Sequence, residues 1–184
     1  ASHFAYAGES VNFAGVQGTA GRSTLAGVSG SVVWRAGPTL EIASGTGRVS
    51  LSDVYPWLTT FAPLRATFKD FGQPSGIQVV DSLTLHGPFL RPAEWQFRLK
   101  GSVEDLAVRS ILFPGTLRIF RGRVDFTDRA ASLADASTRL LDSSFVAGAQ
   151  IAEYPSDQPS LTATLDGRLG QETTNWIANL VHAP

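Results

Sequence analysis

The residue types that most often perform chemistry are scattered along this sequence. The three histidines, His3, His86 and His182, are far apart and lack the spacing of metal ligands. The segment from Gly27 to Ser31 is similar to the turn that carries a nucleophilic serine, but a serine stands where that turn needs its second glycine. The absence of cysteine excludes disulfides, thiolate zinc sites and cysteine nucleophiles. We therefore expect no metal site, no cofactor and no nucleophilic catalysis.

Acid–base chemistry by paired carboxylates is the remaining enzymatic option, because a glycosidase needs two of them across a cleft. The available carboxylates each fit equally well as solvent-facing residues of strands or turns: Glu94, Glu104, Asp105, Asp125, Asp128 and Asp142. A glycosidase therefore ranks last among the interpretations, and we expect a protein that is not an enzyme.

The densest basic cluster contains Arg118, Arg121, Arg123 and Arg129. A solvated strand face is its simplest explanation. The functional alternative is contact with anionic lipid headgroups, for which Arg118, Arg121 and Arg123 are the candidates. The net charge of −1 argues against a nucleic-acid partner.

Aromatic side chains suggest a second kind of binding surface. The four tryptophans could form a platform for sugar rings, although three of them lie at apolar periodic positions that favour core packing: Trp34, Trp57, Trp95 and Trp176.

Short segments of period two position these residues. The chain has 184 residues, of which 43% are hydrophobic and 17% charged, enough for one domain with a core. Apolar and polar residues alternate in segments about ten residues apart, and glycine or proline separates them. Clear examples are Trp95 to Lys100 and Leu161 to Leu165. This pattern predicts one antiparallel, mainly β domain over residues 1–184.

One segment, about 53–71, has helical periodicity instead. Apolar residues recur there at steps of three and four, and Ser52 or Asp53 can cap the start. Pro63 divides the segment into two short helices. We expect Trp57, Phe61, Phe68 and Phe71 to pack against the sheet. A weaker helical set closes the chain: Thr173, Trp176, Ile177, Leu180 and Val181.

The ordered motifs of the chain resemble one protein family. Leu51 to Leu58 reads LSDVYPWL, and Leu83 to Pro88 (LTLHGP) and Pro92 to Phe97 (PAEWQF) follow. Later motifs come in the same order as in the family: Gly101 to Val103, Phe113 to Gly115, Leu140 to Ser144 with Gly148, and Leu165 to Gly170. From about Val28 to the C-terminus, the set is similar to the AsmA-like proteins of Gram-negative envelopes, of the TamB and YhdP type.

The resemblance implies a fold, a place and a role. It implies an antiparallel sheet curled into a taco-like groove, in the periplasmic part of a protein anchored in the inner membrane. It also implies that phospholipid passes between the inner and outer membranes, or that outer-membrane biogenesis is assisted. The sequence begins Ala1-Ser2-His3 and contains no methionine, so we expect a fragment whose membrane anchor lies outside it. No apolar segment approaches the roughly 20 residues of a membrane span.

Alternating strands with one apolar face are what such a groove needs, but a closed β-sandwich needs the same pattern. We therefore expect either a groove for phospholipid or fatty acyl chains or a sandwich that binds carbohydrate or protein. A third interpretation is a module that offers a sheet edge to an envelope protein partner. The candidate groove positions are Val49, Leu51, Val79, Leu83, Leu85, Trp95, Phe97, Leu99, Val124, Phe126, Leu161 and Leu165, for each of which core packing is an equal alternative.

Overall fold

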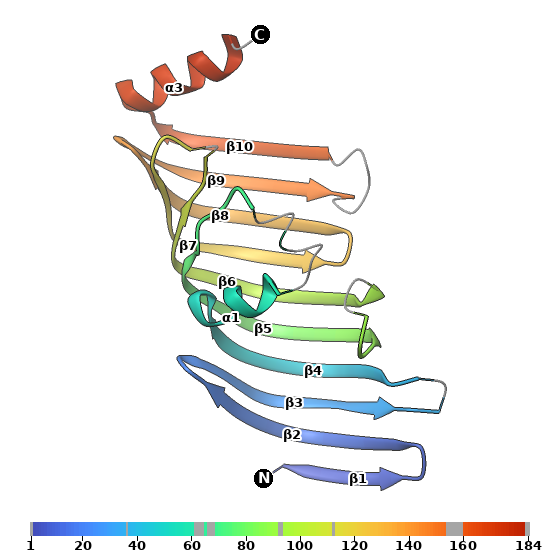
Figure 1. Ribbon diagram of the computed structural model, residues 1–184. Coiled ribbons are helices and arrows are strands. Elements are labelled where there is room, and N and C mark those ends of the chain that lie inside the picture. The colour runs from blue at the N-terminus through green and yellow to red at the C-terminus, as the bar shows by residue number, and fades with distance from the viewer. Residues whose placement is uncertain are drawn as a thin grey trace.

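The computed structural model describes residues 2–35, 37–60, 65, 69–91, 94–111, 113–153 and 160–182 (Figure 1). Ten antiparallel strands form one sheet in chain order, so each strand pairs with its sequence neighbours. The sheet is not closed, because β1 and β10 are its two edges. The prediction of a mainly β chain is confirmed. The sequence left two arrangements open, a curled open sheet and a closed sandwich, and the structure has an open sheet. The strands are β1 (His3–Ala7), β2 (Ser10–Ala20), β3 (Ser23–Val33), β4 (Thr39–Ser50), β5 (Ser75–Pro88), β6 (Gln96–Arg109), β7 (Thr116–Thr127), β8 (Ala130–Leu140), β9 (Ser143–Ala152) and β10 (Ser160–Arg168).

Bulges interrupt the regular alternation of most strands. The β5–β6 register shifts between Val80 and Ser82, and the β8–β9 register shifts between Leu133 and Ala136. Asp105 and Asp135 occupy the left-handed region, with φ of 49° and 52°, which aspartate tolerates better than most residues. Each bulge adds one residue, so the positions that face one side change between odd and even numbers. Figure 1 shows the strands bending toward the end of the sheet that carries the helices.

Glycines allow neighbouring strands to approach closely at several points. A Cβ at Gly101 would collide with the carbonyl oxygen of Val79 on β5. A Cβ at Gly30 would collide with the carbonyl oxygen of Glu41 on β4. At these positions no other residue fits without a backbone shift, so the glycines belong to the curvature of the sheet.

Two helices lie at one end of the sheet: α1 (Leu51–Leu58) and α3 (Gln171–His182) (Figure 1). The expected short helical insert is observed as α1, which begins at Leu51, and the helical set at the end of the chain is observed as α3. Asp53 lies inside the first turn of α1 and does not precede it; its carboxylate accepts a hydrogen bond from the backbone N–H of Arg22 at 2.7 Å. Two further expectations lie outside the described residues or side chains. They are the packing of Trp57, Phe61 and Phe68 against the sheet and the second short helix after Pro63. No described helix has both the length and the apolar character that crossing a membrane requires.

The core is small for a chain of this length. Within the described part of the chain, the buried hydrophobic side chains belong to the four strands β5, β6, β7 and β8: Val80, Val103, Ile119, Val124, Ala136 and Leu140. Leu99, Phe126 and Leu133 are partly buried against this cluster. All the described strands belong to the one sheet, so none of them forms a second layer over the core.

Candidate functional site: an uncovered apolar face

One face of the sheet carries apolar side chains across all ten strands, and we call it the apolar face. Residues paired directly across neighbouring strands point to the same side, so the strand registers define this face. One row crosses from β1 to β6: Phe4, Phe13, Gly30, Ile42, Leu85 and Phe97. A second row crosses from β5 to β10: Leu83, Leu99, Phe126, Ala131, Ile151 and Leu161. The apolar face is therefore continuous from one sheet edge to the other.

The side chains of the apolar face become more exposed to solvent from the central strands toward both edges of the sheet. Val103 and Val124, on the central strands, are 4% and 6% exposed. By contrast, Phe4 on β1 is 67% exposed, and Leu161 and Leu165 on β10 are 68% and 53% exposed. Between the edges, row members such as Ile42 and Leu85 are half-buried. A continuous apolar surface that leaves large side chains exposed in this way usually marks a binding surface.

A pocket deepens the apolar face where α1 meets the sheet. Leu51, Val54 and Tyr55 of α1 form one wall, and Leu106 and Val108 of β6 form the other, around a volume of about 300 Å³. Phe71, Gly72 and Pro74, from the segment before β5, complete it. The Tyr55 hydroxyl donates a hydrogen bond to the carbonyl of Phe71 at 2.9 Å, which ties the helix to that segment. This volume is at the lower limit of small-molecule pockets.

Most predicted groove positions lie on the apolar face. Val49, Leu83, Leu85, Phe97, Leu99, Val124, Phe126, Leu161 and Leu165 face this side, as the registers show. Leu51 is in α1 and lines its pocket. Trp95 precedes β6 and lies against Gly87, where its indole N–H donates to the carbonyl of Pro88 at 2.8 Å.

The structure corrects the prediction for Val79, which lies on the opposite face of the sheet. It pairs with Arg48 on β4 and with Ser102 on β6, and both of these carry polar side chains. Its neighbour Val80, 5% exposed, occupies the apolar face instead. The register shift next to Val80 exchanges odd and even positions, so the alternation of Leu83 and Leu85 does not extend to Val79.

The same effect hid other residues of the apolar face from sequence reasoning. Leu106 and Ile119 pair with each other, and Leu133 pairs with Val124 on this side. The aspartates at the bulges, Asp105 and Asp135, were the available signal, because aspartate is enriched in left-handed backbone.

The opposite face of the sheet carries charged side chains, and we call it the polar face. The three headgroup candidates, Arg118, Arg121 and Arg123, all lie there and do not border the apolar face. Arg123 forms an ion pair with Asp135. Arg121 is directly opposite Glu104, whose carboxylate is 2.5 Å from the guanidinium of Arg48.

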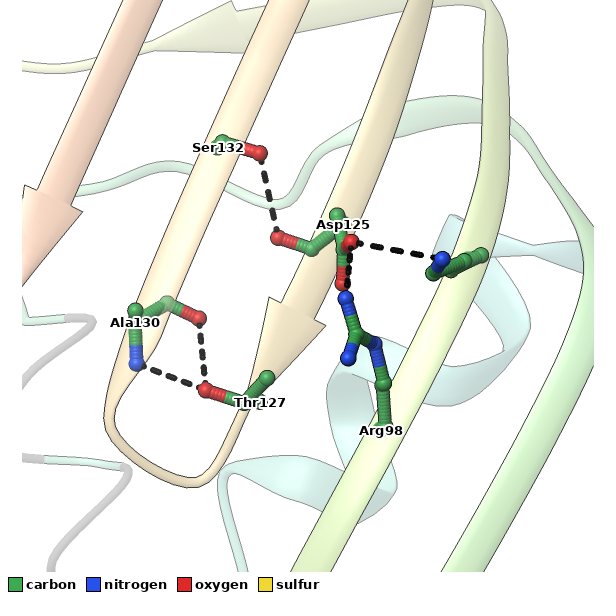
Figure 2. A network of polar contacts seen from close by, with 6 residues as sticks. Arg98, Asp125, Thr127, Ala130 and Ser132 are labelled. Atoms are coloured by element: carbon green, nitrogen blue, oxygen red, sulfur yellow. Dashed lines mark hydrogen bonds and ion pairs between the residues drawn. The ribbon is translucent and has the colours of Figure 1, made fainter.

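Figure 2 shows an ion pair that crosses this polar face: Arg98 on β6 reaches Asp125 on β7 at 2.8 Å. The Lys100 ammonium is 4.0 Å from the same carboxylate oxygen. The hydrogen bond to Asp125 raises the pKa of the Arg98 guanidinium, so this guanidinium stays charged. In the adjoining turn, the Thr127 hydroxyl accepts the backbone N–H of Ala130 at 2.9 Å.

Five of the six carboxylates considered for acid–base chemistry have structural partners, among them Glu104 and Asp125 in the ion pairs of the polar face. Glu94 pairs with Arg91 and Asp128 lies 3.8 Å from Arg129. Asp142 accepts backbone hydrogen bonds from the start of α3. Among the described residues, no three histidine, aspartate or glutamate side chains group as metal ligands would.

Comparison with protein-family models, with curated proteins and with solved structures finds no match to this chain.

Proposed function

We propose that this chain is a non-enzymatic domain that holds phospholipid or fatty acyl chains along its apolar face. The observation that carries the proposal is the apolar face, whose two overlapping rows together cross all ten strands and over which the described residues place no second sheet. The pocket beside α1 offers a deeper apolar end to the same surface.

Acyl chains fit this surface for a physical reason. Each methylene group moved from water onto apolar side chains contributes about 0.8 kcal/mol, so ten methylenes contribute about 8 kcal/mol before the cost of ordering. Such binding needs no catalytic residue and no metal. The rows of Leu, Ile, Val and Phe side chains provide length, which an acyl chain matches better than a compact solute.

The sequence resemblance supports the same proposal and adds a place for it. An AsmA-like envelope protein would hold this sheet in the periplasm, with its anchor in the inner membrane outside the present chain. Lipid bound along the sheet would then move between the inner and outer membranes and serve outer-membrane biogenesis.

Mass spectrometry of an organic extract of the purified chain tests the proposal, with an unrelated β-protein as reference. We expect stoichiometric phospholipid or fatty acid in this sample only. Leu165→Asp places a charge on the apolar face at an exposed site, so it should reduce bound lipid severalfold while the chain stays folded. Val146→Asp is the matched control, because Val146 is 49% exposed on the neighbouring strand and faces the other side.

Two results would contradict the proposal. One is a clean extract together with no uptake of added lipid. The other is equal lipid loss in the two aspartate variants, which would indicate that charge anywhere on the sheet has the same effect. Either result would favour the carbohydrate- or protein-binding alternatives, which glycan and protein partner screens then test.

A further inference from the structure

Some arginines of the polar face form no ion pair with any described residue. Others on this face are paired with carboxylates, as Arg48 is with Glu104 and Arg98 with Asp125. Three more occupy a single cross-strand row: Arg118 on β7, Arg139 on β8 and Arg168 on β10. We call these three the arginine row. None of the three forms an ion pair with any described residue.

The strand registers place this row without ambiguity. Arg118 is directly opposite Arg139, Arg139 is opposite Ser144 on β9, and Ser144 is opposite Arg168. Directly opposite side chains have Cβ atoms about 5 Å apart, and like charges at such positions destabilise a sheet. A folded chain that keeps this arrangement gains stability from an anion placed between the guanidinium groups.

A shallow pocket of about 500 Å³ lies on the row. Arg118 and Arg139 line it together with Thr116, and Phe120 and Leu141 form its apolar walls. The Arg109 guanidinium donates to the Thr116 hydroxyl at 3.1 Å, which brings a further positive charge to the pocket. Among the residues that the structure describes, no carboxylate lines this pocket.

We propose that the arginine row is a binding site for a phosphate group, on the face of the sheet opposite the apolar face. Guanidinium groups suit this ligand, because each can donate two parallel hydrogen bonds to a phosphate. The Thr116 hydroxyl adds a neutral donor at the pocket wall. The site does not use the apolar face, so it is independent of acyl-chain binding.

The experiment measures two ligands that carry the same chemistry. Isothermal titration with inorganic pyrophosphate detects a soluble phosphate ligand. Co-sedimentation with vesicles of phosphatidylcholine containing phosphatidylglycerol, compared with pure phosphatidylcholine, detects binding to lipid headgroups. The test variant is Arg118→Gln with Arg139→Gln. The matched control is Arg35→Gln with Arg91→Gln, which removes the same charge from residues already paired with Glu9 and Glu94.

We expect the test variant to bind at least about tenfold more weakly, since it loses the charge-assisted hydrogen bonds of two guanidinium groups. The control should retain its binding. Selective loss with pyrophosphate identifies a soluble phosphate ligand, and selective loss with vesicles alone identifies headgroups. Binding of neither ligand, or equal weakening in both double variants, would overturn the proposal.

Discussion

The Asp142 carboxylate accepts a hydrogen bond from the backbone N–H of Thr173 at 3.2 Å and lies 3.0 Å from its hydroxyl. The same carboxylate accepts the backbone N–H of Glu172 at 3.0 Å. The turn between β8 and β9 thus caps a helix that begins 29 residues later at Gln171. The first N–H groups of a helix have no partner within it, so this contact fastens α3 to the sheet.

Acid should loosen α3 before it unfolds the sheet. Burial raises the pKa of Asp142, but the N–H donors of Glu172 and Thr173 outweigh it, and the net pKa in the folded chain is below its usual value. The stabilising contribution is therefore complete above the ordinary pKa of about 3.9 and is lost as pH falls below it. The protection factors of the α3 amides against hydrogen exchange should fall below about pH 4.

Substitution of the same residue checks this cause. Asp142→Ala should speed the hydrogen exchange of the α3 amides roughly five- to tenfold at neutral pH, which is the effect of losing a helix cap. The substitution should also remove the acid dependence of their protection factors. Asp81→Asn, at an exposed site on β5, is the control and should change neither. An unchanged acid dependence in Asp142→Ala would show that another group fastens the helix.

The close approach at Gly101 should make the sheet intolerant of a single methyl group there. Gly101→Ala should lower the free energy of unfolding by about 2–3 kcal/mol, because the new Cβ collides with the carbonyl oxygen of Val79. Gly18→Ala is the matched control, since a Cβ at Gly18 meets no atom within 4 Å. Urea denaturation measures both, and equal stability of the two variants would contradict the packing described here.

The apolar face should contribute to stability at its centre and little at its edge. Phe126 packs partly buried against the core, so Phe126→Ala should cost about 2 kcal/mol of unfolding free energy. Leu165 is 53% exposed, so Leu165→Ala should cost only about 0.5 kcal/mol. Chemical denaturation of both variants checks the difference. A large loss at Leu165 would mean that the edge is covered in solution.

The native chain should bind an apolar fluorescent dye such as ANS without unfolding. A closed sandwich hides its apolar faces, whereas this sheet leaves Phe4 and Leu161 more than 60% exposed. Molten states also bind the dye, so cooperative thermal unfolding must be shown in the same sample. Added fatty acid should displace the dye. A native, cooperative chain that binds no dye would contradict an uncovered apolar face.

The strands and their polarity could be predicted because period-two alternation is a local property. Trp95 to Lys100 alternates without interruption, and every apolar member faces the same side in the structure. The prediction for Val79 failed because the bulge beside Val80 changes which alternate residues face the apolar side. A bulge depends on how two strands pair, so one strand's sequence does not reveal it. The arginine row could not be predicted for the same reason. Arg118 belongs to a cluster that is local in the sequence, whereas Arg139 and Arg168 are placed in its row only by the registers of β8, β9 and β10.

By itself, the sequence determined a mainly β chain with one apolar and one polar face, because the alternation of side chains follows from backbone geometry alone. Only the tertiary structure decided that the apolar face of the described strands lacks a second sheet. Alternation records which side chains avoid water in each strand, but whether another layer covers them depends on where the remaining strands pair. Here every described strand joins the same sheet, and the exposed rows from Phe4 to Leu161 are the result.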